Sequence, residues 1–256
     1  WLYDPRADAW TVAGTMSARR ADHAAVLVTA GPDAGSVLIL GGGNGPVPYG
    51  DPAWQATASV DRFDPATGRL APWTPLNDAR AKFAIAALPD GTFLVTGGVT
   101  TLAVGAVPTA ERVNTLTGSV DRLSGMNRPR YGHTATPLPD GRVLIAGDGS
   151  AERYDPATGT FDPIAARPLR PRTGATATAT SDGRVLFAGG EEEDLLWGSV
   201  ESWDPTAGGF VFVGGLQTPR TGHTATLLTS GPDAGAVLVL GGELTATQAS
   251  VAELVR

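Results

Sequence analysis

Two charged residues stand where a repeated sequence elsewhere has glycine. Five related segments begin with an arginine, and three of them have glycine two positions later, whereas the other two have Asp22 and Lys82. A carboxylate can act as a general acid or base, and Lys82, the only lysine in the chain, could act as a base or a Schiff-base nucleophile. The alternative is a solvated ion pair that contributes little. Because exceptions to a regular pattern are where function is most readily grafted, we expect a site over these two segments.

The arginines that begin the five segments form a second candidate site. They are Arg20, Arg80, Arg130, Arg172 and Arg220. Five guanidinium groups around one opening would attract an anion such as a carboxylate, a phosphate or an acidic peptide. The alternative is that each arginine binds carbonyl groups of the adjoining loop and joins neighbouring units. We favour this architectural role because the position recurs in every unit.

Three histidines share one position of the repeat. His23, His133 and His223 occupy it in three units, and Phe83 and Ala175 occupy it in the other two. Three histidines could bind zinc, but a position that also takes Phe and Ala is typical of packing. We therefore expect no metal ion and no cofactor.

The longest loop segment, Gly43–Thr57, carries the aromatic candidates Tyr49 and Trp54. Both could contact a ligand, although Trp54 could equally pack under its own loop. Trp197 follows the acidic run Glu191–Asp194 and could serve as a sugar-stacking platform or as an anchor for that loop. The acidic run lacks the alternating ligand spacing of a calcium loop, so we interpret it as solvated.

Asp148 is a further exception, since it follows Gly147 where the other units have a second glycine. Asp148 and Asp22 could form an acid/base pair of carboxylates. They belong to different repeats, and their pairing depends on how the repeats are arranged. Asp22, Lys82 and Asp148 are therefore the catalytic candidates.

The elements that position these residues follow from one unit. Thr134–Leu138 alternates small and apolar residues, and Val143–Ala146 is a continuous apolar run typical of a buried strand. Glu152–Tyr154 alternates again, and a fourth strand begins at Thr160. Asp-Gly and Asp-Pro turns separate these strands. Four antiparallel strands per unit predict one blade of a β-propeller.

The spacing of the arginines predicts how many blades there are. Successive arginines are 42 to 60 residues apart, and 56 residues lead from Arg220 through the C-terminus and on from Trp1 to Arg20. We therefore expect five blades, with Ala9–Gly14 completing the last one and closing the ring. However, Ser250–Val255 and Leu2–Asp4 both read as the third strand of that blade. A fragment of a six- or seven-bladed propeller remains the alternative.

The predicted organisation is one domain over residues 1–256. The expected blades span about 17–77, 78–127, 128–169, 170–217, and 218–256 together with 1–16.

Two motifs carry a resemblance to a known family. A di-glycine follows the second strand, as in Gly41-Gly42, and an aromatic-Asp-Pro turn follows the third, as in Tyr154-Asp155-Pro156. This pattern resembles the kelch repeat family in its bacterial, galactose-oxidase-like form. The resemblance covers essentially the whole chain and implies the fold more strongly than any function. It raises copper-oxidase chemistry, but the Tyr–Cys cofactor of those enzymes needs a cysteine that this chain lacks.

Composition excludes several classes of function. The net charge of −7 gives no support for nucleic-acid binding, and no apolar run is long enough to span a membrane. The absence of cysteine removes disulfides, thiolate metal sites and cysteine nucleophiles. The chain is expected to be a monomer. The resemblance implies a secreted or periplasmic protein rather than a cytoplasmic one.

Three functions stay open at this point. The first is a non-catalytic propeller that binds a peptide, glycan or protein partner over blades 1 and 2. The second is an enzyme of the isomerase, mutarotase or cyclase type, as the resemblance allows. The third is a structural module of an exported protein. Residues that could carry out chemistry are few, while the scaffold is regular, and this favours binding over catalysis.

Overall fold

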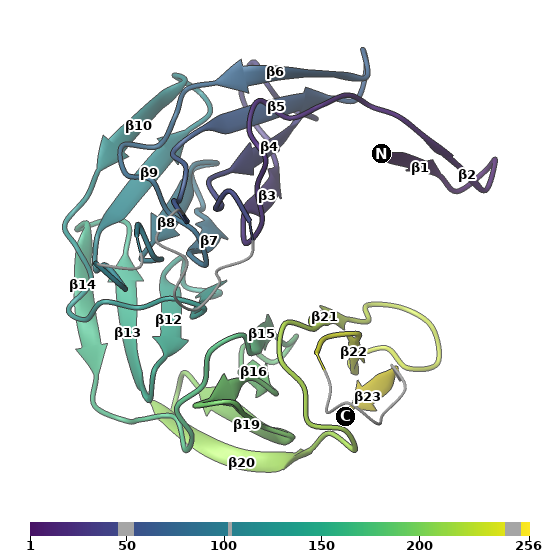
Figure 1. Cartoon of the computed structure of the whole chain (residues 1–256). Helices are drawn as coiled ribbons and strands as arrows, with labels where there is room; N and C mark the ends of the chain where they lie inside the picture. The colour runs from purple at the N-terminus through teal and green to yellow at the C-terminus, as the bar shows by residue number, and fades with distance from the viewer. Residues whose placement is uncertain (46–53, 102–103, 244–251) are drawn as a thin grey trace.

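Each repeat folds into a twisted antiparallel sheet whose first strand lies nearest the central axis (Figure 1). The computed structural model describes residues 1–45, 54–101, 104–243 and 252–256. These residues form strands and turns and no helix, so the described part of the chain has no helix that could cross a membrane. The sheets follow one another around an arc, which confirms the predicted all-β propeller with five blades.

Four blades have all four strands. Blade 1 contains β3 (Ala24–Leu27), β4 (Val37–Leu40), β5 (Val60–Asp64) and β6 (Arg69–Trp73). Blade 2 contains β7 (Ala84–Ala87), β8 (Phe93–Thr96), β9 (Ala110–Asn114) and β10 (Ser119–Arg122). Blade 3 contains β11 (Thr134–Pro137), β12 (Val143–Gly147), β13 (Ser150–Asp155) and β14 (Thr160–Ile164). Blade 4 contains β15 (Thr176–Ala179), β16 (Val185–Ala188), β19 (Ser199–Asp204) and β20 (Gly209–Gly215). A small hairpin of β17 (Glu191–Glu192) and β18 (Leu195–Leu196) projects from blade 4 between its second and third strands.

The fifth blade and the N-terminus depart from the expected closure. Blade 5 is a three-stranded sheet of β21 (Thr224–Leu227), β22 (Val237–Leu240) and β23 (Glu253–Val255). The N-terminal strands β1 (Leu2–Asp4) and β2 (Ala9–Thr11) pair with each other, and their hairpin stands apart across an opening in the arc (Figure 1). The prediction that the N-terminal strand completes the last blade is therefore wrong for this structure. The reason is that β1 takes β2 as its partner, while β23 already serves as the third strand of blade 5.

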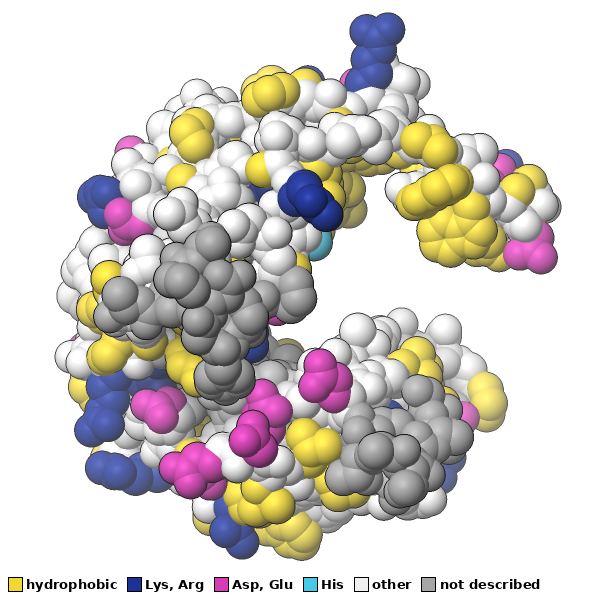
Figure 2. All heavy atoms as spheres, viewed as in Figure 1, with side chains coloured by type: hydrophobic (Ala, Val, Ile, Leu, Met, Phe, Trp, Pro, Cys, Tyr) yellow, Lys and Arg dark blue, Asp and Glu magenta, His cyan; other side chains and the backbone are white. Residues whose placement is uncertain are grey.

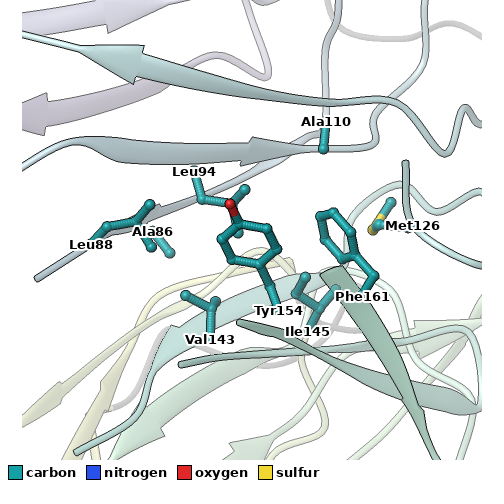
Figure 3. Close-up of a cluster of buried hydrophobic side chains, with 9 residues drawn as sticks. All are labelled: Ala86, Leu88, Leu94, Ala110, Met126, Val143, Ile145, Tyr154 and Phe161. Carbon is teal, nitrogen blue, oxygen red and sulfur yellow. The ribbon is translucent and has the colours of Figure 1, made fainter. Parts of the chain in front are cut away.

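The core lies between neighbouring blades. The rings of Tyr154 and Phe161 of blade 3 lie 4.8 Å apart between centroids, with their planes tilted by 44°. They pack in one cluster with Leu94 of blade 2 and Met126 (Figure 3). Tyr154 and Leu94 are almost completely buried. Such an aromatic pair contributes about 0.5–1.5 kcal/mol beyond its buried area. The continuous apolar runs of the second strands follow from this arrangement, because both faces of an inner blade are covered.

The two blades at the ends of the arc each have one uncovered face. Val37, Ile39 and Phe63 of blade 1 line an apolar hollow with Trp1 and Leu2. Ile39 and Phe63 are only half-buried, whereas their counterparts in blade 3, Ile145 and Tyr154, are almost completely buried. On blade 5, Leu240 is 43% exposed and Leu254 is 40% exposed. These faces resemble those that pack against a neighbour elsewhere in the arc.

Candidate functional site

A chain of backbone hydrogen bonds joins the turns that precede the first strands of the five blades. The N–H group of Lys82 donates to the carbonyl oxygen of Asp22 at 3.0 Å, and that of Gly132 donates to Lys82 at 2.7 Å. Gly174 donates to Gly132 at 2.8 Å, and Gly222 donates to Gly174 at 3.0 Å. The five positions that the repeat predicted to be equivalent are therefore in direct succession around the axis.

All five residues of this chain of bonds have a left-handed backbone. Gly132, Gly174 and Gly222 have φ values of 57° to 63°, and Asp22 and Lys82 have φ values of 55° and 51°. Glycine adopts this conformation freely, whereas a residue with a Cβ atom pays about 1–2 kcal/mol. Asp tolerates it better than Lys does. Backbone strain of this kind gathers at functional sites.

The five turns line an open cavity of about 560 Å³ at the mouth of the central channel. This volume lies in the range of about 300–1,000 Å³ that is typical of small-molecule sites. Figure 2 shows the hollow at the centre of the arc, with acidic side chains gathered beside it. The residues that carry chemistry here are Asp22, Lys82, Tyr131, Thr173, Glu191, Thr221 and Glu243, and Phe83 and the three histidines also line the wall.

The four charged side chains of the cavity form no salt bridges within the described structure. Asp22 and Lys82 form no ion pair with each other, so the solvated pair considered from the sequence does not form. In the part of the chain that the structure describes, no salt bridge involves any of the four charged cavity residues, which are Asp22, Lys82, Glu191 and Glu243. Free charges in a cavity can bind a ligand without first breaking an internal pair.

Glu191 and Glu243 are functional candidates that the sequence reasoning did not identify. The N–H and C=O groups of Glu191 both pair with Thr173 at 2.9 Å, and Glu243 pairs with Thr221 in the same way. These bonds place the residue after the di-glycine beside the turn that lines the cavity. The signal was present, because Gly189-Gly190-Glu191 and Gly241-Gly242-Glu243 are equivalent triplets.

The Glu191 carboxyl group has an altered affinity for protons. Burial raises its pKa above the ordinary value, and the negative charges of Glu243 and Asp194 raise it further, while Lys82 opposes the shift. The interaction between Lys82 and Glu191 connects blades 2 and 4 across the cavity. A carboxyl group with a raised pKa holds or releases a proton nearer to neutral pH.

The five repeat arginines do not line the cavity. Each guanidinium group is buried and donates to the carbonyl oxygen of the glycine that follows the second strand, for example from Arg130 to Gly147 at 2.7 Å. Each also pairs with a buried carboxylate of the third strand, as Arg130 does with Glu152 at 2.9 Å. The other pairs are Arg20–Asp61, Arg80–Glu111, Arg172–Glu201 and Arg220–Glu253. These contacts are those of the architectural role that the sequence analysis favoured. Because the five guanidinium groups are buried and paired, they do not form an open ring that could bind an anion.

His133 and His223 serve as packing residues, whereas His23 is exposed. Nε2 of His133 lies 2.9 Å from Oγ1 of Thr96 on the neighbouring blade, and Nε2 of His223 makes the same contact with Thr176. A Cβ atom on Gly97 would lie 2.7 Å from Cε1 of His133, and one on Gly41 would lie 2.7 Å from Cε1 of Phe83. Imidazole and phenyl rings thus fill equivalent spaces. Among the described residues, no group of three His, Asp or Glu side chains is arranged to hold a metal ion.

The aromatic candidates lie away from the cavity or outside the described residues. Trp54 is buried against Ala81 and Val99, and its Nε1 donates to the carbonyl oxygen of Gly45 at 3.0 Å. The prediction that Trp54 contacts a ligand is therefore wrong in this structure, because the side chain fills the space under its own loop. Tyr49 lies outside the described residues.

Trp197 anchors its own loop. Its Nε1 donates to the carbonyl oxygen of Pro171 at 3.2 Å, and the Arg170 guanidinium lies 4.7 Å from the ring centroid. Trp197 does not line the cavity, so the anchoring alternative describes it better than the sugar-stacking platform.

Asp148 does not meet Asp22, because it is exposed and does not line the cavity. Asp148 and Gly149, with φ values of 53° and 63°, form the two-residue turn between paired Gly147 and Ser150. A type I′ hairpin turn needs positive φ at both positions, which explains this exception to the repeat.

Comparisons with known proteins establish the fold and no family. No family model matches the sequence, and no curated protein matches it significantly. Among solved structures, that of YjhT has a TM-score of 0.74 and 14% identity, and the match covers 92% of this chain and 81% of that one. At this level of identity the likeness supports the propeller fold alone. Membership of the kelch family stays a prediction.

Proposed function

We propose that this protein is a binding propeller that holds a small, hydroxyl-rich ligand, such as the end of a glycan, in the cavity at the channel mouth. The observation that supports this most is the contrast between its two sets of charges. All five buried arginines are neutralised by carboxylates, whereas the four charges of the cavity have no salt-bridge partner in the described structure. The charges that hold the blades together are paired, whereas these four cavity charges are left without a salt bridge in the described structure.

The chemistry of the wall supports a ligand with many hydroxyl groups. Asp22, Glu191 and Glu243 accept hydrogen bonds, Lys82 donates them, and the threonine hydroxyl groups do both. Tyr131, which is 40% exposed, supplies an apolar ring beside these polar groups. A sugar presents hydroxyl donors, oxygen acceptors and an apolar ring face together. The proposed site lies across all five blades rather than over blades 1 and 2 alone, and the propeller would be of the kelch type.

A second candidate is an enzyme of the isomerase or mutarotase type, which the raised pKa of Glu191 favours. Such reactions need a group that can take up and return a proton near neutral pH. The pKa of Glu191, a cavity residue, is shifted upward by burial, which is the direction that such a group requires, and Lys82 lies within electrostatic reach of it. Binding is the primary proposal because it requires only the unpaired groups.

The test uses a panel of D-glucose, D-galactose, D-mannose and N-acetyl-D-glucosamine, with binding measured by saturation-transfer NMR. We expect at least one sugar to bind and Glu191→Gln to weaken that binding. Glu193→Gln is the matched control, since Glu193 is exposed on the same hairpin and does not line the cavity. Absence of binding by all four sugars, or equal effects of the two substitutions, would contradict the proposal. Mutarotation of the bound sugar, followed by NMR of its anomers, distinguishes catalysis from binding.

A further inference from the structure

We infer that Lys82 keeps a strained backbone because its side chain determines ligand specificity, and that the fold is less stable as a result. This inference rests on the proposed function, since it assigns one contact within the same cavity. Lys82 has a φ of 51° at a position where three other blades have glycine. Asp22 shares the conformation, but Lys tolerates it less well.

The fold does not require a lysine at this position. In the described structure, the Lys82 side chain makes no hydrogen bond or ion pair, and its backbone bonds to Asp22 and Gly132 are the same ones that glycine makes in other blades. The side chain is half-buried in the cavity wall. Lys82 therefore carries the cost of the conformation without a hydrogen bond or an ion pair to offset it, and its charge acts only through the longer-range attraction to Glu191 across the cavity.

Backbone conformation, rather than lack of space, accounts for glycine at one equivalent position. A Cβ atom on Gly174 would overlap Oγ1 of Thr221, so the Thr221 hydroxyl group would have to turn away to admit a side chain there. A Cβ atom on Gly222 would meet nothing within 4 Å. The left-handed backbone, and not a shortage of space, therefore favours glycine at position 222. The backbone at position 82 has the same conformation and the same preference for glycine, yet the sequence places a lysine there.

The ligand feature that fits this pair is two adjacent hydroxyl groups. The Lys82 ammonium group donates to an oxygen, and the Asp22 carboxylate accepts from an O–H group. The two residues come from neighbouring blades and are joined by the 3.0 Å backbone bond. Vicinal hydroxyl groups on a sugar ring can satisfy both at once, one as acceptor and one as donor.

The chain offers a matched control in Asp148. This residue is also left-handed, with a φ of 53°, but it is exposed in a hairpin turn outside the cavity. A type I′ turn accepts Gly-Gly at its two central positions, so Asp148→Gly removes a similar strain. It changes no group that could contact a ligand in the cavity.

The experiment compares Lys82→Gly, Lys82→Met and Asp148→Gly by thermal unfolding and by binding of the same four sugars. We expect Lys82→Gly to raise Tm by about 2–4 °C and to weaken sugar binding at least about tenfold. Lys82→Met keeps the strain, so it should weaken binding with little change in Tm. Asp148→Gly should raise Tm and leave binding unchanged.

The outcomes separate this inference from the proposed function. If the wild type binds a sugar and Lys82→Gly either keeps full affinity or lowers Tm, the inference is overturned and the proposed function stands. If the wild type binds none of the four sugars, the proposed function fails, and the specificity role of Lys82 fails with it. A higher Tm for Lys82→Gly would then still show that the Lys82 backbone is strained, but it would not support a role of the Lys82 side chain in ligand specificity.

Discussion

The N–H group of Lys82 donates to the carbonyl oxygen of Asp22 at 3.0 Å, and both residues have a left-handed backbone that three other blades assign to glycine. This bond is the first step of the chain that runs through Gly132, Gly174 and Gly222. It shows how one loop geometry can be kept while its chemistry changes. The blades supply the same turn five times, and two of them place a charge on it.

Replacing Arg130 with Met should cost about 3–5 kcal/mol of unfolding free energy, measured by urea denaturation. The reason is that Glu152 would stay buried without its cation, and two carbonyl groups would lose a donor. Arg142→Met is the control, because Arg142 and Asp155 form a partly exposed pair at 3.0 Å that should contribute less than about 1 kcal/mol. Replacing Arg130 and Glu152 together with Met should be less harmful than Arg130→Met alone. Similar small losses for Arg130→Met and Arg142→Met would refute the architectural role.

Stability should fall on mild acidification because of the buried histidines. Burial, assisted by Arg130 and Arg80, lowers the pKa of His133 to about 3, from 6.5 in the absence of these effects. Between these values the unfolded chain binds a proton that the folded chain does not, so stability is complete above pH 6.5 and decreases toward pH 3. His223, whose pKa burial lowers to about 4, acts in the same direction.

The test is urea unfolding at about pH 7 and about pH 5 for the wild type and for His133→Phe. Phe is the natural occupant of this position in blade 2, at Phe83. A single histidine contributes a slope of up to about 1.4 kcal/mol per pH unit below its unfolded pKa. His133→Phe should therefore remove the part of the pH dependence that His133 contributes, while His23 and His223, whose pKa values burial also lowers, keep theirs. An unchanged slope would show that folding does not lower the pKa of His133.

Trp54→Ala should destabilise the protein by about 3–5 kcal/mol and leave ligand binding unchanged. Trp54 is 3% exposed and packs on Ala81 and Val99, away from the cavity wall. The measurement pairs urea denaturation with sugar binding by saturation-transfer NMR. If the variant remains fully folded and loses sugar binding, Trp54 must contribute to the binding site, contrary to this prediction.

The sequence predicted the blades well because each strand has a local signal. The apolar run Val143–Ala146 and the alternation around Glu152 became β12 and β13, and the Asp-Pro turns recur where expected. Closure of the ring was mispredicted, because it depends on which of two strands of similar pattern pairs with β22. Local sequence does not encode that choice between β1 and β23.

For the site, the exceptions Asp22 and Lys82 were found as breaks in a repeat, and both line the cavity. Glu191 was read as part of a solvated acidic run, because its bond to Thr173 depends on how the loops meet in three dimensions. Trp54 was misassigned because an aromatic residue in a long loop gives the same signal whether it is buried or exposed. The carboxylate partners of the arginines were missed, although each stands two residues before an apolar position of the third strand.

The most direct measurement of the central claim uses the fact that Lys82 is the only lysine of the chain. Reductive methylation with ¹³C-formaldehyde labels its amine and the N-terminal amine, and the two signals can be told apart by preparing the Lys82→Met variant. If the cavity holds a hydroxyl-rich ligand, the Lys82 signal should shift in a saturable manner with a bound sugar, and the N-terminal signal should not. A sugar that binds by saturation transfer while the Lys82 signal stays unmoved would contradict the account.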